Sequence, residues 1–238
     1  MRYFYLLIIL LSMHCNSAYD PTLSPLENAE QQYAESLSAE LQAVGYPDKN
    51  KVGRILLRAF KEEKKLEVWI EKPGADSMLL FKVYDFAGFS GTLGPKRKEG
   101  DFQIPEGVYF IDRFNPRSRF HLSLGLNYPN KSDRILGHPT APGSDIFIHG
   151  NTQTIGCIPI TDLKIRELYL LTSYAAAGRQ KQIPVFIFPF VMNDKNMSRH
   201  SDSKHFGFWK NLAVVFDKSN PRTGFPPEFS VNEAGEYF

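Results

Sequence analysis

The chain has 238 residues, of which 42% are hydrophobic and 23% are charged. This composition is too apolar for a disordered chain, and the length suffices to bury the core of one large domain or two small ones. The 28 basic and 26 acidic residues leave a net charge of only +2, so no basic excess points to a nucleic-acid-binding protein. The absence of repeats and long low-complexity tracts excludes a collagen or coiled-coil protein, and no series of long apolar stretches indicates a polytopic membrane protein.

The first 17 residues have the pattern of a secretory signal peptide. Arg2 precedes an apolar run of 11 residues, 3–13, and small or polar residues follow. A charged start, a short apolar core and small residues after it are typical of such signals, and the run is too short for a convincing bilayer span. We expect cleavage after Ser17 or Ala18, and a mature chain that works in the periplasm or cell envelope.

The chain holds two cysteines, Cys15 and Cys157. Cys15 is either removed with the signal peptide or lipidated, in which case it anchors the chain, although His14 is not the small residue that usually precedes a lipoprotein cysteine. In both cases Cys157 is left as a lone thiol in an oxidising compartment. Such a thiol is either a buried, inert small hydrophobe or a catalytic nucleophile.

An N-terminal helical segment is predicted over residues 18–50. Ser24, Pro25 and Glu27 are typical of a helix start, since serine can cap the helix, proline suits its first position and glutamate completes a capping box. Apolar residues at helical spacing follow, and Gly45 with Pro47 ends the helix. We expect this helix to pack on the outside of the domain that follows.

A catalytic domain is predicted over residues 51–191, where the pattern changes to strands. Thr161 or Asp162 is expected to cap a helix that runs to about Gly178, with Leu163 among its apolar positions. The element order favours a mainly β fold, sandwich-like or barrel-like, with peripheral helices and α+β overall. The expected strands are 54–60, 65–70, 78–84, 108–114, 120–126, 145–149 and 183–188.

Residues 192–238 form a separate region rich in polar residues. A helix is predicted near 203–216, and the tail contains several prolines. An independent domain of this size would be marginally stable, and its aromatic side chains need cover. We therefore expect a C-terminal extension packed on the catalytic domain.

The candidate reaction centre is a strand that ends in His149, followed eight residues later by Gly156 and Cys157. The short polar loop between them can fold back, so that the imidazole reaches the thiol and activates it as a nucleophile. Gly156 lets a substrate carbonyl come close, and backbone N–H groups around Gly156, Cys157 and Ile158 can face a developing oxyanion. No acid lies beside His149, so we expect a backbone carbonyl such as that of Gly150 to orient it.

The motif Ile148-His149-Gly150 followed by Gly156-Cys157-Ile158 resembles the catalytic signature of YkuD-type L,D-transpeptidases, the cysteine enzymes of bacterial peptidoglycan. Five other segments are similar to the YafK-like branch of that superfamily, and the resemblance spans about residues 51–238. These segments are SGTLGPK (90–96), GDFQIPEGVY (100–109), HLS (121–123), YPN (128–130) and MSRHSDSK (197–204).

The resemblance implies that Cys157 is the nucleophile and His149 the base. It further implies peptidoglycan stem peptides as substrate, an envelope lipoprotein as a possible partner, no cofactor, and acylation by carbapenems. The spacing between base and nucleophile is about half the usual family spacing, as in the YafK-like branch. Two positions differ from the family pattern: Ile155 stands where a histidine is usual, and Pro159 where an arginine or asparagine is common.

Three residues are candidates for substrate binding because the resemblance runs through them: His121, Tyr128 and Arg134. Arg134 can pair with a carboxylate of the stem peptide. Ordinary packing of loops and strands explains all three equally well. His138 is a rival base at the longer family spacing, but it lies in a Gly-His-Pro turn and not at the end of a buried strand.

No metal or nucleotide site is predicted. The histidines lack the HxxxH or HExxH spacing of zinc sites, and the glycine-rich stretch at 91–96 lacks the spacing of a phosphate-binding loop. Three functions stay open: a transpeptidase, a carboxypeptidase or amidase of the same mechanism that hydrolyses the stem peptide or its lipoprotein link, and a non-catalytic wall-binding module.

Overall fold

A computed structural model describes residues 18–178 and 180–238, so the predicted signal peptide and Cys15 lie outside the described residues. Eight strands form one mixed sheet in the order β3-β2-β1-β8-β4-β5-β6-β7. The strands are β1 (Ile55–Phe60), β2 (Lys65–Glu71), β3 (Met78–Asp85), β4 (Gly107–Ser118), β5 (His121–Leu126), β6 (Phe147–His149), β7 (Ile158–Pro159) and β8 (Ile183–Phe188).

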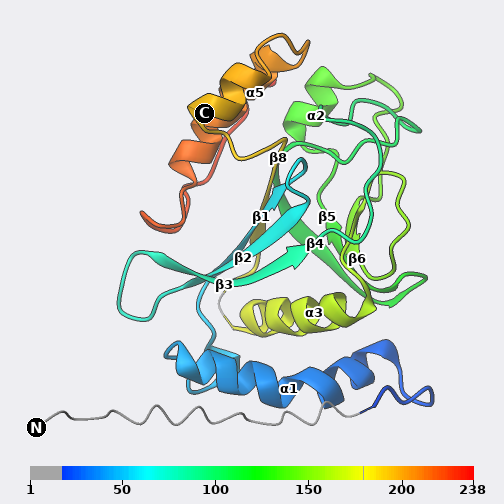
Figure 1. Cartoon of the computed structure of the whole chain (residues 1–238), viewed down its shortest axis with the longest axis vertical. Helices are drawn as coiled ribbons and strands as arrows, with labels where there is room; N and C mark the ends of the chain where they lie inside the picture. Colours follow the sequence, from blue (N-terminus) through cyan, green and yellow to red (C-terminus); the bar gives the residue numbers. More distant parts are fainter. Residues whose placement is uncertain (1–17, 179) are drawn as a thin grey trace, which may run out of the picture.

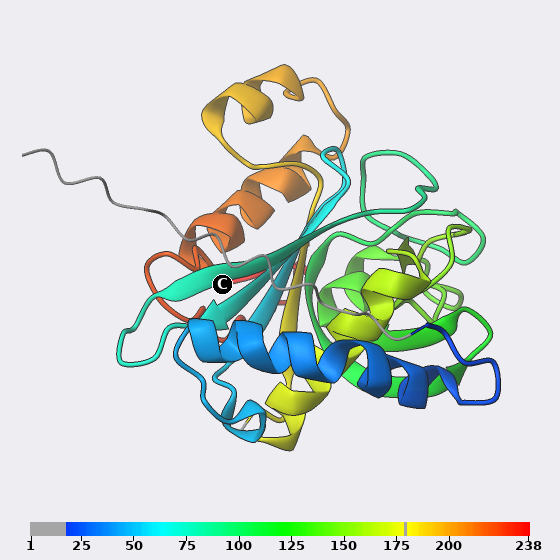
Figure 2. The same cartoon turned by 60° about the horizontal axis from the view of Figure 1, so that its bottom comes forward.

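The helices lie on both faces of this sheet. Figures 1 and 2 show α1 (Pro25–Ala43) and α3 (Asp162–Ala177) together on one side, and α5 (Phe206–Lys218) on the other. The shorter helices are η1 (Lys49–Lys51), α2 (Lys131–Leu136) and α4 (Asp194–Arg199). The expected fold class, mainly β with peripheral helices, is confirmed, and the strands belong to a single curled sheet (Figure 1).

Strand β1 lies inside the sheet and is buried on both faces. Ile55 and Leu57 belong to the core cluster that also contains residues of α1 and α3, whereas Leu56 and Phe60 belong to the cluster on the α5 side. Successive side chains of a strand point to opposite faces. The strand is therefore apolar at nearly every position instead of alternating, as expected where both faces are covered.

Helix α1 begins as its sequence predicts. The Ser24 hydroxyl accepts a hydrogen bond from the Glu27 N–H, and the Glu27 carboxylate accepts one from the Ser24 N–H, so both halves of the capping box are present. Gly45, just beyond the helix, has a φ of 98° that favours glycine. An N–H of Arg166 in α3 donates to Gln32 Oε1 at 2.8 Å and ties the two helices together.

The start of α3 differs from its prediction. Thr161 occupies the position before the helix with a φ of 75°, and its side chain makes no capping hydrogen bond. Asp162 instead accepts a hydrogen bond from the backbone of the loop that follows β6. Leu163, expected at an apolar position, is 61% exposed because the first turn of the helix projects beyond the core.

Four short elements were absent from the predicted set: η1, β7, α2 and α4. Strand β7 has only two residues and exists because Ile158 and Pro159 pair in parallel with Ile148 and His149 of β6. Helix α2 begins with a capping box in which Asn130 and Asp133 bond each other's backbone N–H groups. Elements this short give little periodic signal in a sequence.

The C-terminal residues pack on the second face of the sheet. The Phe216 ring stands edge-on to the rings of Phe60 and Phe188, with centroids 6.3 and 5.2 Å away. The indole N–H of Trp209 donates to Glu106 Oε2 at 2.8 Å in the buried interior. Within the described part of the chain, no helix combines the length and the apolar character needed to cross a bilayer.

Candidate active site

His149 is the last residue of β6 and is only 2% exposed. Its ring lies against the Phe120 ring, with centroids 4.8 Å apart. Strand β6 pairs with β5 on one side and β7 on the other, so its backbone is held from both edges. The imidazole is therefore carried on a rigid element, as a base that must meet its partner in one geometry requires.

The backbone of the next residue orients the imidazole. His149 Nδ1 lies 2.5 Å from the Gly150 carbonyl oxygen. Because a carbonyl only accepts hydrogen bonds, Nδ1 carries the hydrogen in the neutral ring, and Nε2 keeps its lone pair. This is the contact with the Gly150 carbonyl that the sequence led us to expect, and it leaves Nε2 able to take a proton.

Cys157 directly precedes β7, the strand that lies beside the strand of His149. The parallel register sets Ile148 beside Ile158, and both side chains are fully buried on the core side. His149 follows Ile148 in β6, and Cys157 comes just before Ile158 at the start of β7. Two residues along a strand and one strand across give a Cα separation of about 8 Å, which a histidine and a cysteine side chain can span together.

The thiol is held by the strand that carries the base. Cys157 Sγ accepts a hydrogen bond from the Phe147 N–H at 3.4 Å and donates to the Asp145 carbonyl at 3.6 Å. Burial raises the pKa of the Cys157 thiol, although the Phe147 N–H and the Lys96 ammonium act in the opposite direction. The thiol therefore keeps its proton at neutral pH.

Burial also lowers the pKa of His149 below its ordinary value, while the Gly150 carbonyl and the Asp162 carboxylate act to raise it. The imidazole is therefore neutral at pH 7. A neutral imidazole beside a protonated thiol differs from the preformed thiolate pair that many cysteine enzymes use.

Thr154 organises the backbone just before Cys157. Its hydroxyl oxygen accepts hydrogen bonds from the N–H groups of Gly156 at 3.2 Å and Cys157 at 2.8 Å, and its hydroxyl hydrogen goes to the Cys157 carbonyl at 2.7 Å. Two of the N–H groups predicted to face an oxyanion therefore bond to Thr154 in this conformation. The oxyanion role of Gly156, Gly150 and Ile158 stays a prediction.

Gly156 is required by its surroundings. Its φ is +135°, and a Cβ there would lie 3.0 Å from the carbonyl oxygen of Gln103. Any other residue would be strained and would push against the 90–106 loop. Gly150 is similarly confined, since a Cβ would lie 2.5 Å from Asp162 Oδ1 and 2.7 Å from the Phe120 carbonyl oxygen.

The candidate substrate-binding residues lie in different surroundings. His121 Nε2 accepts a hydrogen bond from Arg166 Nε at 2.6 Å. Tyr128 is buried, and its hydroxyl donates to the Pro142 carbonyl at 2.8 Å. Arg134 is an exposed residue of α2. For His121 and Tyr128 the observed contacts correspond to the packing role that the sequence left open.

His138, the rival base, is an exposed residue after α2. Its Nδ1 accepts a hydrogen bond from the Ala141 N–H at 3.1 Å, so the ring closes its own turn. Sequence reasoning passed over Thr154, Phe120 and the role of Asp162 beyond helix capping. Only Asp162 gave a signal, as an acid at a predicted helix start.

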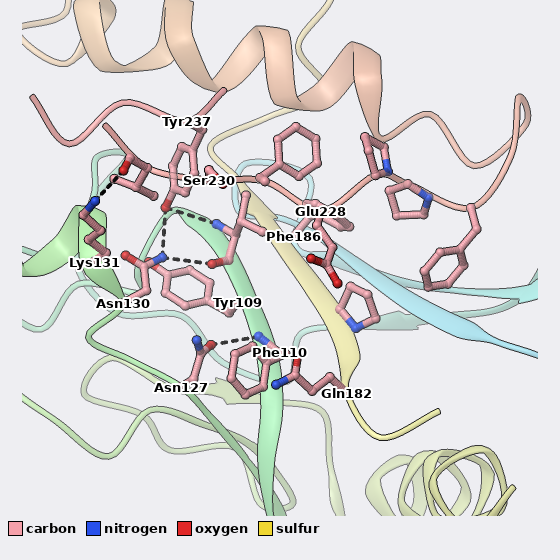
Figure 3. A pocket seen from close by; sticks show the side chains of 17 residues that line it. Tyr109, Phe110, Asn127, Asn130, Lys131, Gln182, Phe186, Glu228, Ser230 and Tyr237 are labelled. Carbon is pink, nitrogen blue, oxygen red and sulfur yellow. Dashed lines mark hydrogen bonds between the residues drawn. The ribbon is translucent and has the colours of Figure 1, made fainter. Parts of the chain in front are cut away.

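Two further features bear on the choice of site. Within residues 18–178 and 180–238, no group of three or more histidine, cysteine, aspartate or glutamate residues is arranged to hold a metal ion. A cavity of about 580 Å³ lies between β4, β8 and the C-terminal segment 225–231, and Figure 3 shows the residues that line it. Asn130 spans one side of it, bonding the Val108 carbonyl and the Tyr237 hydroxyl. Neither Cys157 nor His149 lines this cavity.

Known proteins resemble the chain in sequence and, more distantly, in structure. The L,D-transpeptidase catalytic domain, YkuD, matches residues 79–187. The proteins named putative L,D-transpeptidase YafK from Escherichia coli strain K12 and from Escherichia coli O157:H7 are each 36% identical over 179 residues, which is 74% of this chain and 70% of theirs.

Two solved structures are of the helical cell shape determining protein Pgp2 from Campylobacter jejuni. Its K307A mutant is 19% identical, with a TM-score of 0.46 over 74% of this chain and 60% of that one. The other Pgp2 structure is 16% identical, with a TM-score of 0.45 over 82% of this chain and 80% of that one.

The match to the catalytic domain covers strands β4 to β8, including the His149 turn and Cys157. The identity to the two curated relatives extends over most of both chains. The protein belongs to the YkuD family of L,D-transpeptidase catalytic domains, and to its YafK-like branch.

Proposed function

We propose that this protein is a cysteine-dependent acyltransferase that acts on peptidoglycan stem peptides. The single observation that carries the proposal is that β6 holds both groups: the Gly150 carbonyl orients His149, and the Phe147 N–H bonds Cys157 Sγ. Family membership supports the substrate class. The site needs no cofactor for this chemistry, since the thiol supplies the nucleophile and the imidazole moves the proton.

The reaction has two half-reactions. Cys157 Sγ attacks the carbonyl of a diaminopimelate-linked peptide bond while His149 Nε2 takes the thiol proton. The carbon–nitrogen bond then breaks, His149 returns the proton to the leaving amine, and a thioester to Cys157 remains. An incoming amine resolves the thioester in transpeptidation, and water resolves it in hydrolysis.

Hydrolysis of the stem peptide or of its lipoprotein link is the second candidate. The side chain of Ile155, where the family usually has histidine, is 74% exposed two residues before the nucleophile. An apolar side chain there offers no hydrogen bond to an incoming amine, whereas water needs only access to the thioester. The envelope location and a lipid anchor on Cys15 belong to the same proposal.

The experiment is mass spectrometry of muropeptides after incubation with the mature protein. Disaccharide-tetrapeptides and lipoprotein-linked muropeptides serve as substrates, with Cys157→Ala and His149→Ala as controls. Crosslinked dimers that require Cys157 establish a transpeptidase. Shortened or released monomers without dimers establish the hydrolase.

An unchanged substrate in every reaction, together with no carbapenem adduct on Cys157, would contradict both enzymatic proposals. It would favour the wall-binding module. Products that persist in Cys157→Ala would contradict the assignment of the nucleophile, even if the family activity is present.

A further inference from the structure

One peptide group behind His149 is hydrogen-bonded on both of its sides. The carbonyl of this group belongs to Gly150 and lies 2.5 Å from His149 Nδ1. Its N–H belongs to Asn151 and donates to Asp162 Oδ1 at 2.7 Å. Because the peptide group is planar and conjugated, a carboxylate bonded to its N–H polarises its carbonyl.

The local backbone brings Asp162 to this position. Asn151 has a φ of 60°, a conformation that asparagine tolerates better than most residues. Gly150 has no Cβ that would collide with the Asp162 carboxylate. The Ile160 N–H donates to the His149 carbonyl at 2.9 Å, and the Thr161 N–H donates to the Asn151 carbonyl at 3.2 Å. Hydrogen bonds therefore join residues 160–162, at the start of α3, to residues 149–151, the turn that follows β6.

His121 lies beside the carboxylate of Asp162, whose side chain is 49% exposed. His121 Nδ1 lies 4.0 Å from Asp162 Oδ2, and His121 Nε2 accepts a hydrogen bond from Arg166 Nε at 2.6 Å. Since His121 Nε2 accepts, the hydrogen of the neutral ring is on Nδ1, the side that faces Asp162. Burial and the Arg166 guanidinium lower the pKa of His121, so that this ring stays neutral. His121 therefore brings no positive charge to the side of Asp162.

We propose that Asp162 is a positioning residue that acts on His149 through the Gly150–Asn151 peptide group, holding the ring and stabilising its protonated form while Cys157 attacks. The carboxylate takes the role of the acid in a serine-protease triad, with a peptide group between acid and imidazole. This inference rests on the proposed function, in which His149 is the base.

The charges around His149 are consistent with this role. The titratable groups behind the turn after His149 are Asp162, which bonds the Asn151 N–H, His121, which lies 4.0 Å from Asp162, and Arg166, which bonds His121. Of these, Asp162 is the one whose charge acts to raise the pKa of His149, against the effect of burial. Removing the carboxylate should therefore lower the pKa of His149 and weaken it as a base.

The test compares Asp162→Asn, Asp162→Ala and Asp162→Glu with the wild-type protein. Asparagine keeps an oxygen for the Asn151 N–H but loses the charge, alanine loses both, and glutamate restores a carboxylate. The control is Asp194→Asn, which removes the same charge from the first position of α4. The readouts are the NMR titration and tautomer of the His149 imidazole, assigned by comparison with His149→Ala, and the rate of Cys157 alkylation at pH 7.

We expect Asp162→Asn to lower the pKa of His149 and to slow alkylation by about tenfold, since general-base assistance is partly lost. Asp162→Ala should in addition lower the population of the His149 tautomer that carries its hydrogen on Nδ1. Asp162→Glu should restore part of the alkylation rate. Asp194→Asn should match the wild type. If Asp162→Ala does not fold, the asparagine variant decides the question.

An unchanged or raised pKa of His149 in a folded Asp162→Asn protein would overturn this inference. That result is separate from the muropeptide experiment, because the titration of His149 does not depend on which substrate is cleaved. Conversely, a lowered pKa with no muropeptide product would leave the contact between Asp162 and His149 supported and would contradict only the proposed substrate.

Discussion

At the residue scale, Cys157 and His149 are kept neutral by the same cause. Burial raises the pKa of Cys157 and lowers that of His149, so each group resists the charge that it would carry in the proposed reaction. Such a pair avoids the energetic cost of two resting charges in a half-buried site. The thiol is correspondingly shielded from oxidants, which react with thiolates and much less with thiols.

The shift of His149 gives a pH prediction. The base works only when its ring is neutral, so activity is present above the pKa of His149 and is lost as the pH falls through it. Because burial places that pKa below the ordinary 6.5, we expect the acidic midpoint of kcat/KM for the stem peptide to lie below pH 6.5 under the proposed mechanism. A pH series of kcat/KM checks this, and an acidic midpoint above 6.5 would contradict it.

Thr154 gives a second prediction at this scale. Thr154→Val removes the hydroxyl that bonds two N–H groups and one carbonyl around Cys157. We expect about 1–3 kcal/mol of lost stability and a fall in kcat/KM, because buried backbone groups lose their partner. Urea unfolding and kinetics measure the two effects.

The matched control for Thr154 is Thr152→Val. The Thr152 hydroxyl has one contact of 3.5 Å, to Asn151 Oδ1, and should matter little. Thr154→Ser keeps the hydroxyl and should behave like the wild type. Equal losses in Thr152→Val and Thr154→Val would show that the loop does not depend on this hydroxyl.

At the element scale, the capping residues of two helices differ in the hydrogen bonds that they make outside their own helix. Asn130 caps α2, and its amide group also donates to the Val108 carbonyl and the Tyr237 hydroxyl, both at 2.9 Å (Figure 3). Asn193 caps α4 through a single bond to the Asn196 N–H at 2.9 Å. The first cap therefore joins a helix, a strand and the C-terminal segment, whereas the second serves only its own helix.

We expect Asn130→Ala to lower the free energy of unfolding by about 2–3 kcal/mol and Asn193→Ala by about 1 kcal/mol, since a cap alone is worth about 1 kcal/mol and each buried hydrogen bond adds to it. Urea denaturation of the two variants measures the difference. Equal losses would indicate that the contacts of Asn130 across the cavity contribute nothing to stability.

Local signals explain which elements could be predicted from sequence. The strand at 183–188 and the capping box at Ser24 were predicted correctly because each is encoded within a few residues. The contact between His149 and the Gly150 carbonyl could be expected for the same reason. The bond between Asn151 and Asp162 could not, because it depends on how an eleven-residue stretch returns to the sheet. Strand β7 could not be predicted either, because its two residues form a strand only by pairing with β6.

At the scale of the whole molecule, a buried ion pair joins the main sheet to the C-terminal region. Lys61 and Glu106 are fully buried and lie 2.9 Å apart. Lys61 Nζ also donates to the carbonyls of Gly94 and Ile104, and Glu106 accepts from the Trp209 indole. The pair therefore links the end of β1, the 90–106 loop and α5, and the same loop contacts Gly156 through Gln103.

Removing one member of this pair leaves the other charged and unpaired in the interior. We expect Glu106→Gln to cost about 3–5 kcal/mol of stability. The control is Asp85→Asn, which breaks the exposed pair with Lys65 and should cost less than about 1 kcal/mol. Chemical denaturation compares the two, and a loss below 1 kcal/mol for Glu106→Gln would show that the interior is open to water there.

The parallel pairing of β1 with β8 has a consequence for how the chain acquires its shape. Leu57 is the register partner of Val185, so the middle of the sheet joins a segment made early in synthesis to one made late. Closing so long a loop is entropically costly, and chains rich in distant contacts fold slowly. The strands before β8 have no central partner until it arrives. Strands β1 to β3 can pair with one another before β8 is made, and so can β4 to β7, but the two sets become one sheet only when β8 takes its place between them.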